Sequence, residues 1–107
     1  MDFSDLIKGQ RKFFEQGNTR TLEFRLSMLR KLQDALRSKE SLLNEAMKED
    51  MNKSPSEVYM TETGMVHAEL SFHMRHLKSW MREKRVPTPL AQFPSRSFLS
   101  PEPHGVA

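Results

Sequence analysis

A stripe of apolar residues at helical spacing constrains this chain more than any other feature of its sequence. Its members recur every three or four residues and keep one face of a helix apolar for about four turns: Leu22, Leu26, Leu29, Leu32, Ala35 and Leu36. The bases of the same segment fall mostly on the other faces. Such a face is stabilised mainly by packing against another element. The stripe therefore predicts a helix from about residue 22 that packs within a larger helical unit.

Two further apolar patterns flank this stripe. Residues 3 to 16 carry phenylalanine and aliphatic side chains at roughly helical spacing, and Gly17 follows as a stop signal. Thr19 is then expected to cap the central helix, because threonine side chains accept hydrogen bonds from free backbone N–H groups at helix starts. Ser38 is expected to cap a continuation that ends near Lys53.

The segment Ser54-Pro55-Ser56-Glu57 marks the start of another helix. The serine and the glutamate have the spacing of a capping box, and proline suits the first helical turn. Gly64 costs about 1 kcal/mol in a helix interior. We therefore expect a short helix over residues 54 to 63 that stops and restarts toward Met81, with Arg82 to Arg85 closing the second helix in positive charge.

Beyond Val86 the chain reads as an extended arm. Prolines interrupt it repeatedly, and Phe93, Phe98 and Leu99 lie among proline, serine and arginine residues. An isolated two-stranded hairpin is marginal in water, so we expect this arm to lie on another surface. The predicted fold class is mainly α, with four to five helices followed by an extended or β arm.

The composition excludes several classes of function. The 107 residues contain no cysteine, which excludes disulfides, thiolate metal sites and a thiol nucleophile within them. No apolar run approaches the length of a membrane span, and the first residues carry acids where a signal peptide carries bases. Acids and bases alternate to a net charge of +3, without a basic stripe interleaved with aromatic residues. We expect a cytoplasmic protein without nucleic-acid or membrane partners.

One group of side chains has a spacing that metal ligands also use. Glu69, His73 and His76 fall on one face of a predicted helix, where a carboxylate and two imidazoles could hold a divalent ion. His73 also lies close to the apolar stripe of that helix, which favours a partly buried, hydrogen-bonded histidine. The sequence therefore predicts no metal site.

A second interpretation concerns the basic stretch from Phe72 to Arg85. If it were one helix, its bases would lie opposite Leu77, Trp80 and Met81, as in helices that bind a partner protein or a membrane surface. Under this alternative the chain is a small, free-standing helical interaction protein. The same pattern also fits a domain helix with a charged outer face.

The order and spacing of many residues resemble one enzyme family. The chain is similar to the N-terminal part of the NAD(P)-dependent aldehyde dehydrogenases, in the branch with a short N-terminus (class 3-like). The residues that carry the resemblance are Gln10-Arg11-Lys12-Phe13-Phe14, Gly17, Thr19-Arg20, Leu22, Phe24-Arg25, Leu29, Asp50, Lys53, Glu57, Tyr59, Glu62, Leu77, Trp80, Thr88-Pro89 and Pro101-Glu102-Pro103-His104-Gly105-Val106.

The resemblance implies a parent enzyme with an α/β, Rossmann-like fold that oxidises aldehydes to carboxylic acids with NAD or NADP. Its nucleophilic cysteine, general-base glutamate and oxyanion asparagine would all lie beyond Ala107, so no catalytic or cofactor-binding residue is predicted within the chain. On this basis residues 1–86 would pack on the cofactor-binding domain and residues 87–103 would join two subunits as a homodimer. Residues 104–107 would begin the first cofactor-domain strand. Alone, the 107 residues should be inactive.

Two pairs of residues are singled out as candidates. In this branch the helix start near Thr61 and Met65 borders the aldehyde entry tunnel, so the resemblance makes these two the substrate-side candidates. The alternative for Met65 is simple packing under the helix start. Arg25 protrudes beside the main apolar face and Glu62 opens the later helix. We expect these two to pair across the packed helices, at about 0 to 1 kcal/mol if the pair is exposed.

Overall fold

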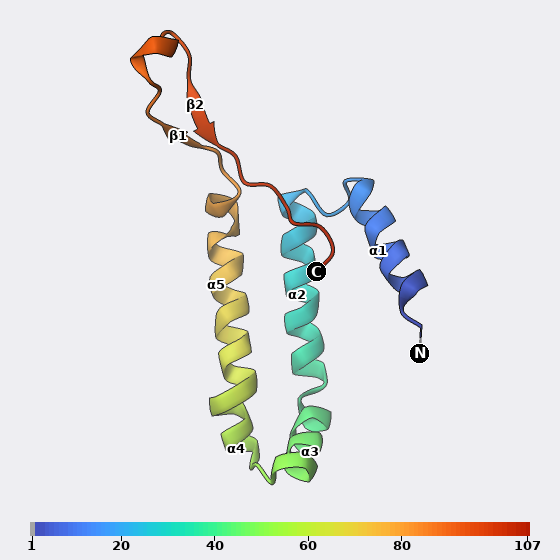
Figure 1. The fold of residues 1–107 in the computed structure, drawn as a ribbon. Helices are drawn as coiled ribbons and strands as arrows, with labels where there is room; N and C mark the ends of the chain where they lie inside the picture. The colour runs from blue at the N-terminus through green and yellow to red at the C-terminus, as the bar shows by residue number, and fades with distance from the viewer. Residues whose placement is uncertain (1) are drawn as a thin grey trace.

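The computed structural model describes residues 2–107 and is mainly helical, with a short β arm near its end (Figure 1). This confirms the predicted fold class. Along the chain the elements are α1 (Ser4–Glu15), α2 (Leu22–Ser38), α3 (Glu40–Met51), α4 (Pro55–Val58), the π-helical turn η1 (Tyr59–Thr63), α5 (Gly64–Trp80), β1 (Lys84–Val86), the 3-10 turn η2 (Leu90–Gln92) and β2 (Ser97–Leu99).

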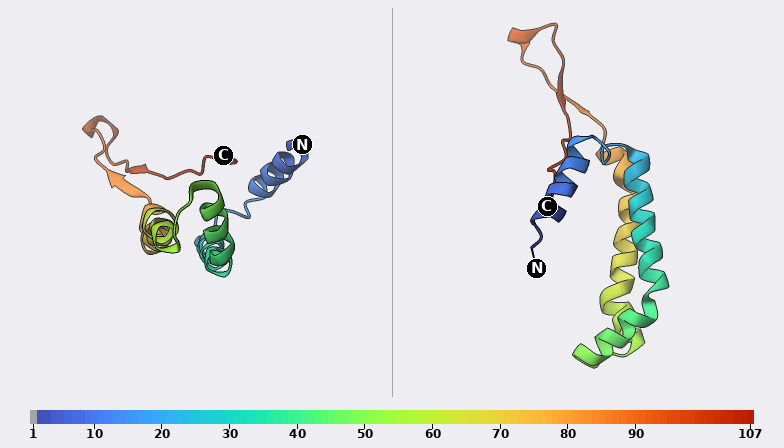
Figure 2. Two further views of the ribbon diagram at one scale, coloured as in Figure 1. Left: turned by 90° about the horizontal axis from the view of Figure 1, so that it is seen from below. Right: turned by 90° about the vertical axis from the view of Figure 1, so that its right-hand side faces the viewer.

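Helices α2 and α5 lie side by side and antiparallel as one long helical hairpin, with α3 and α4 at its bend (Figures 1 and 2). The molecule measures 65 × 34 × 23 Å, so it is elongated. Between the two long helices, Gln33 Nε2 donates to Ser71 Oγ over 3.2 Å, and Leu70 is buried. Helix α1 stands apart from the hairpin, at the end opposite the bend.

The start of α2 differs from the expected cap. Thr21, not Thr19, has the extended backbone of an N-cap residue, and its Oγ1 accepts from Phe24 N at 3.2 Å. Because a cap of this kind lies three residues before the N–H it binds, Thr19 is two residues too early. Ser38 is also not a cap, since its hydroxyl donates to the Ala35 carbonyl within α2.

The start of α4 agrees with the sequence. Ser54 Oγ accepts from Glu57 N at 3.3 Å, and Ser54 N donates to Glu57 Oε2 at 2.8 Å, which together form the predicted capping box. The predicted break at Gly64 is wrong. The helix passes through this position because the π-turn Tyr59–Thr63 joins α4 to α5 without a gap.

Helix α5 ends at Trp80, so the expected helical course of residues 81 to 85 is wrong. Lys84–Val86 instead pairs antiparallel with Ser97–Leu99, Lys84 facing Leu99 and Val86 facing Ser97. The ladder uses backbone groups that a continued helix would need, and the prolines that follow Val86 already prevent a helix there. The amphipathic helix expected over Phe72 to Arg85 therefore loses its last five residues to a turn and a strand.

Few apolar side chains are buried in the described part of the chain. Val58 is fully covered and Leu70 is 7% exposed, whereas many large apolar side chains on α1, the bend, α5 and the arm are open to solvent. A folded monomer normally leaves only modest apolar patches uncovered. The chain therefore presents extensive surface for contacts outside itself.

Candidate docking groove

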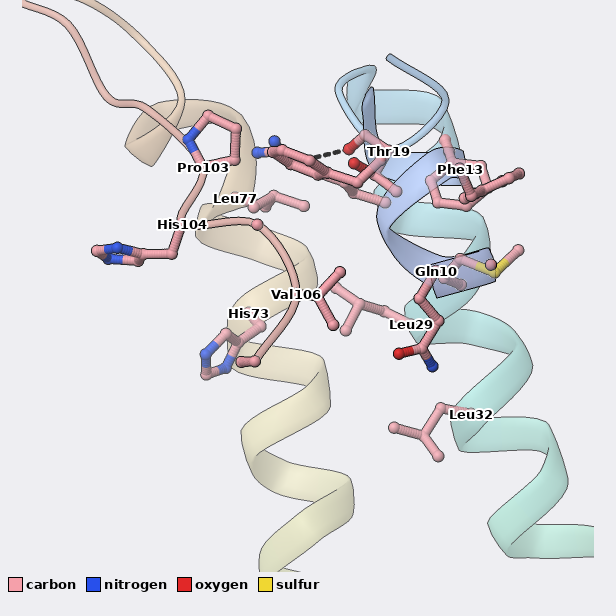
Figure 3. Close-up of a pocket in the computed structure, with 17 residues that line it drawn as sticks. Gln10, Phe13, Thr19, Leu29, Leu32, His73, Leu77, Pro103, His104 and Val106 are labelled. Atoms are coloured by element: carbon pink, nitrogen blue, oxygen red, sulfur yellow. Dashed lines mark hydrogen bonds between the residues drawn. The ribbon is translucent and has the colours of Figure 1, made fainter. Parts of the chain in front are cut away.

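An apolar groove of about 820 Å³ lies between α1, α2, α5 and residues 103–107 (Figure 3). Helix α1 is tied to α2 by the rings of Phe13 and Phe24, whose centroids lie 5.7 Å apart. Each element contributes apolar side chains to the wall, among them Phe14, Leu29, Leu32, Leu77 and Val106. An apolar groove of this kind favours packing against another apolar surface.

Residues 103–107, the tail of the chain, form one wall of this groove, and the course of their backbone depends on Gly105. This glycine has φ of +99°, a backbone conformation that residues with a side chain rarely adopt. A Cβ atom built at this position would lie 3.7 Å from the ring of Phe14, so the tail passes close over α1. The tail expected to begin an enzyme strand thus lies against the first helix within this chain.

Arg25 lies at the rim of the groove, next to a smaller cavity of about 450 Å³ lined also by Arg20, Trp80 and Glu102. Its Nε donates to the Thr19 carbonyl over 2.8 Å, shown as a dashed line in Figure 3. This bond satisfies a backbone acceptor in the loop before α2. Arg25 therefore ties that loop to α2.

Glu62 lies at the other end of the hairpin from Arg25. Its Oε1 accepts from Lys53 Nζ at 2.7 Å, and the two side chains are 41% and 25% exposed. The structure therefore does not bring Arg25 and Glu62 together, and the predicted pair is not formed. The Gln33–Ser71 bond explains this, because an antiparallel register through that point places the start of α2 beside the end of α5.

Thr61 and Met65 also lie at the bend, far from the groove. Thr61 Oγ1 donates to the Glu57 carbonyl over 2.8 Å and accepts from Lys53 Nζ at 3.1 Å. Met65 is 63% exposed, so packing beneath the helix start does not cover it within this chain. Their neighbours Tyr59 and Met60 are similarly open. The sequence pattern did not single out Met60, because it predicted an ordinary α-helix where the structure has a π-turn.

Two of the three histidines of α5, His73 and His76, direct one ring nitrogen to the backbone. Nδ1 of His73 donates to the Glu69 carbonyl over 2.9 Å, and Nδ1 of His76 donates to the Phe72 carbonyl over 2.8 Å. The ring of His76 also lies beside those of Phe72 and Trp80, at centroid distances of 4.1 and 5.7 Å. Within residues 2–107 no group of three side chains is arranged to hold a metal ion.

The described residues contain no glycine-rich loop of the kind that binds phosphates. Phosphate-binding loops place several glycines together at a helix start. The four glycines here are isolated, at positions 9, 17, 64 and 105.

Among residues 2–107, no helix is both long and apolar enough to cross a membrane.

Comparison with known proteins gives consistent relatives over most of the chain. No family model matches the sequence. The chain is 38% identical over 93 residues to a 4,4'-diaponeurosporen-aldehyde dehydrogenase of Staphylococcus aureus, covering 87% of this chain and 20% of that protein. It is 35% identical over 104 residues to mouse aldehyde dehydrogenase family 3 member B1, covering 97% of this chain and 22% of that protein.

A solved structure agrees with these relatives. The substrate-bound state of Staphylococcus aureus AldH has 34% sequence identity to the chain and a TM-score of 0.88, over 96% of this chain and 23% of the solved one. The chain therefore spans about a fifth of the length of the proteins it matches. The similarity extends through the helical hairpin and the arm together.

Proposed function

We propose, from the premise that this chain is the N-terminal segment of an aldehyde dehydrogenase, that it serves as scaffold in an enzyme that oxidises aldehydes to carboxylic acids with NAD or NADP. One observation carries the proposal: a solved aldehyde dehydrogenase superposes on 96% of the chain with a TM-score of 0.88. The matched region is only 23% of that enzyme's length. The chemistry then belongs to the remainder of the enzyme.

The residues of the chain support a scaffolding role. It contains no cysteine, so the thiolate that attacks the aldehyde in this family must come from elsewhere, and the isolated segment should be inactive. The cofactor is assigned to the remainder on the same ground, because the scattered glycines form no phosphate loop. When bound there, the nicotinamide accepts the hydride of the aldehyde.

The uncovered surfaces suggest how the segment joins the remainder. Residues 1–86, which are helical up to Trp80 and include β1, would pack on the cofactor-binding domain through the apolar groove, and residues 104–107 would continue into its first strand. The arm, residues 87–103, would join two subunits as a homodimer. Leu90 and Phe93 at its tip are 91% and 82% exposed, as expected for side chains that a second subunit covers.

Thr61 and Met65 remain the candidates for the substrate side of this enzyme. Met65 would offer an apolar contact, and its exposure leaves it free to make one. One relative, of Staphylococcus aureus, is named for an aldehyde, 4,4'-diaponeurosporen-aldehyde, which supports an aldehyde substrate here. We place the enzyme in the cytoplasm.

The proposal is tested on the protein isolated from its source. Intact mass should show a species several times heavier than the 12.5 kDa of this chain, and that species should produce NADH or NADPH when an aldehyde is added. A natural product of 12.5 kDa that forms neither would contradict the enzymatic role. That result would support the free-standing interaction protein instead.

A further inference from the structure

The smaller cavity beside Arg25 combines two arginines with walls that are otherwise mostly apolar. It has a volume of about 450 Å³ and lies where the loop before α2, the end of α5 and the stretch Pro101–Pro103 meet. Figure 1 shows the chain after β2 passing the end of α5 toward the start of α2. Three segments far apart in the sequence therefore enclose one charged cavity.

Neither arginine of this cavity has an acidic partner within residues 2–107. Every ion pair in this part of the chain is made by another base. The side chain of Arg20 makes no hydrogen bond to these residues, and that of Arg25 makes one, from Nε to the Thr19 carbonyl over 2.8 Å. A guanidinium carries five N–H donors, so most donors of the two arginines remain available.

The chain itself holds Arg25 in a fixed orientation. The side chain is half-buried, and its bond to the Thr19 carbonyl leaves the two terminal nitrogens as a fork. Such a fork pairs with both oxygens of a carboxylate. Because Arg25 is already ordered, it loses little conformational entropy when an anion binds. Arg20 is exposed and supplies a second positive charge at the same cavity.

The charges around the cavity favour a single carboxylate over a phosphate. Glu102 also lines it, so two positive side chains and one negative one leave one positive charge to neutralise. Helix α5 contributes its carboxyl end, where the helix dipole is negative. Phosphate sites use backbone N–H groups at helix starts, whereas Pro101 and Pro103 have no N–H to donate.

We propose that Arg20 and Arg25 bind one aspartate or glutamate side chain from the part of the enzyme that follows residue 107. The inference rests on the proposed function, which supplies that part. The stretch Pro101–Pro103 forms a wall of the cavity and leads into residues 104–107, so the remainder of the enzyme continues close to it. The side chains of Leu77 and Trp80 keep water from the ion pair and so strengthen it. The bound carboxylate fixes the segment at a point outside the apolar groove.

The test is zero-length cross-linking of the complete enzyme in its Arg20→Lys variant. A carbodiimide joins an amine to a carboxylate that touches it: the amide C–N bond forms, and one carboxylate oxygen leaves in the urea by-product. Peptide mass spectrometry should find a link from position 20 to one aspartate or glutamate beyond residue 107. Arg30→Lys is the matched control and should not link to that acid, because Arg30 is exposed on α2 and lines neither cavity.

Thermal unfolding of the same complete enzyme measures the strength of the pair. Arg20→Gln should lower the unfolding midpoint by about 2 °C, and Arg30→Gln by less than about 1 °C. Replacing the identified acid by its amide should also lower the midpoint. The double variant with Arg20→Gln should lose less than the two single losses together, because both changes remove the same contact. Fully additive losses would contradict the pairing.

The remaining outcomes separate this inference from the proposed function. In an active enzyme, a link from position 20 to Glu102 alone, or to no carboxylate, would overturn the inference and leave the proposed function standing. Inorganic phosphate that raised the wild-type midpoint above that in chloride at equal ionic strength, but not the Arg20→Gln midpoint, would show an open anion site and also overturn it. A wild-type protein that oxidises no aldehyde would overturn both.

Discussion

The bend of the helical hairpin and the β arm are both connections that contain proline, yet only the bend is fixed by contacts of its own. At the bend, Val58 is fully buried, Ser54 and Glu57 cap a helix start, and Lys53 binds Glu62 at 2.7 Å. In the arm, two strands of three residues pair while the tip residue Leu90 is 91% exposed. The difference indicates that the bend specifies its own shape, whereas the arm depends on the surface that covers it.

The largest effect should come from the packing that joins α2 to α5. Leu70 is 7% exposed, so Leu70→Ala should lower the free energy of unfolding by about 2–4 kcal/mol, through lost burial and the cavity left behind. The measurement is chemical denaturation of the chain, followed by far-ultraviolet circular dichroism.

Leu90→Ala is the matched control for this substitution, because it removes the same atoms from a side chain that is 91% exposed. It should change the free energy of unfolding by less than about 0.5 kcal/mol. Equal effects at the two positions would show that the arm folds as one unit with the hairpin, and the contrast between the two connections would be lost.

An intermediate effect should come from the cap at the bend. Ser54→Ala removes the side-chain acceptor for Glu57 N and should cost about 1 kcal/mol of unfolding free energy. Ser56→Ala, in the exposed first turn of α4, changes the same side chain without touching the cap and should be nearly neutral. If both variants unfolded at the wild-type denaturant concentration, local capping would not be the contact that fixes the bend.

Local signals predicted the helical part of this fold well. The leucine stripe of α2 and the capping box at Ser54 each depend on neighbours within a few residues, and the structure contains both. The family resemblance was also recognisable from spacing, and the relatives confirm it. The apolar groove is formed by four segments far apart in the sequence, so no local pattern indicated it.

The predictions that failed needed information that is not local. A glycine often ends a helix, but Gly64 lies inside one. Its backbone N–H donates to the carbonyl of Tyr59, five residues earlier, which a sequence pattern does not reveal. Arg25 and Glu62 have opposite charges, but the register of an antiparallel hairpin separates them. Thr61 and Met65 both lie near the bend, and the hydrogen bond that Thr61 accepts from Lys53 lies in a turn type that propensity does not reveal.

The smallest predicted effect is the pH dependence of the bend. Hydrogen bonds from the backbone and then the side chain of Ser54 hold the pKa of Glu57 below its ordinary value of 4.5. As the pH falls, the unfolded chain therefore binds this proton before the folded chain does. The stabilisation by Glu57 is complete above about pH 4.5 and is lost as the pH falls through the lower, folded pKa.

Glu57→Gln isolates this contribution, because glutamine can still complete a capping box but carries no titrating proton. The wild type should be more stable than this variant at neutral pH, and the difference should shrink as the pH falls below about 4.5. Glu83→Gln is the control from the base of the arm, where Ser100 Oγ donates to Glu83 over 3.3 Å. Denaturation midpoints measured between neutral and acidic pH decide the matter: if the Glu57→Gln difference stays constant across that range, the carboxylate does not link the bend to pH. A larger change for Glu83→Gln would place the acid-sensitive contact in the arm and reverse the contrast between the two connections.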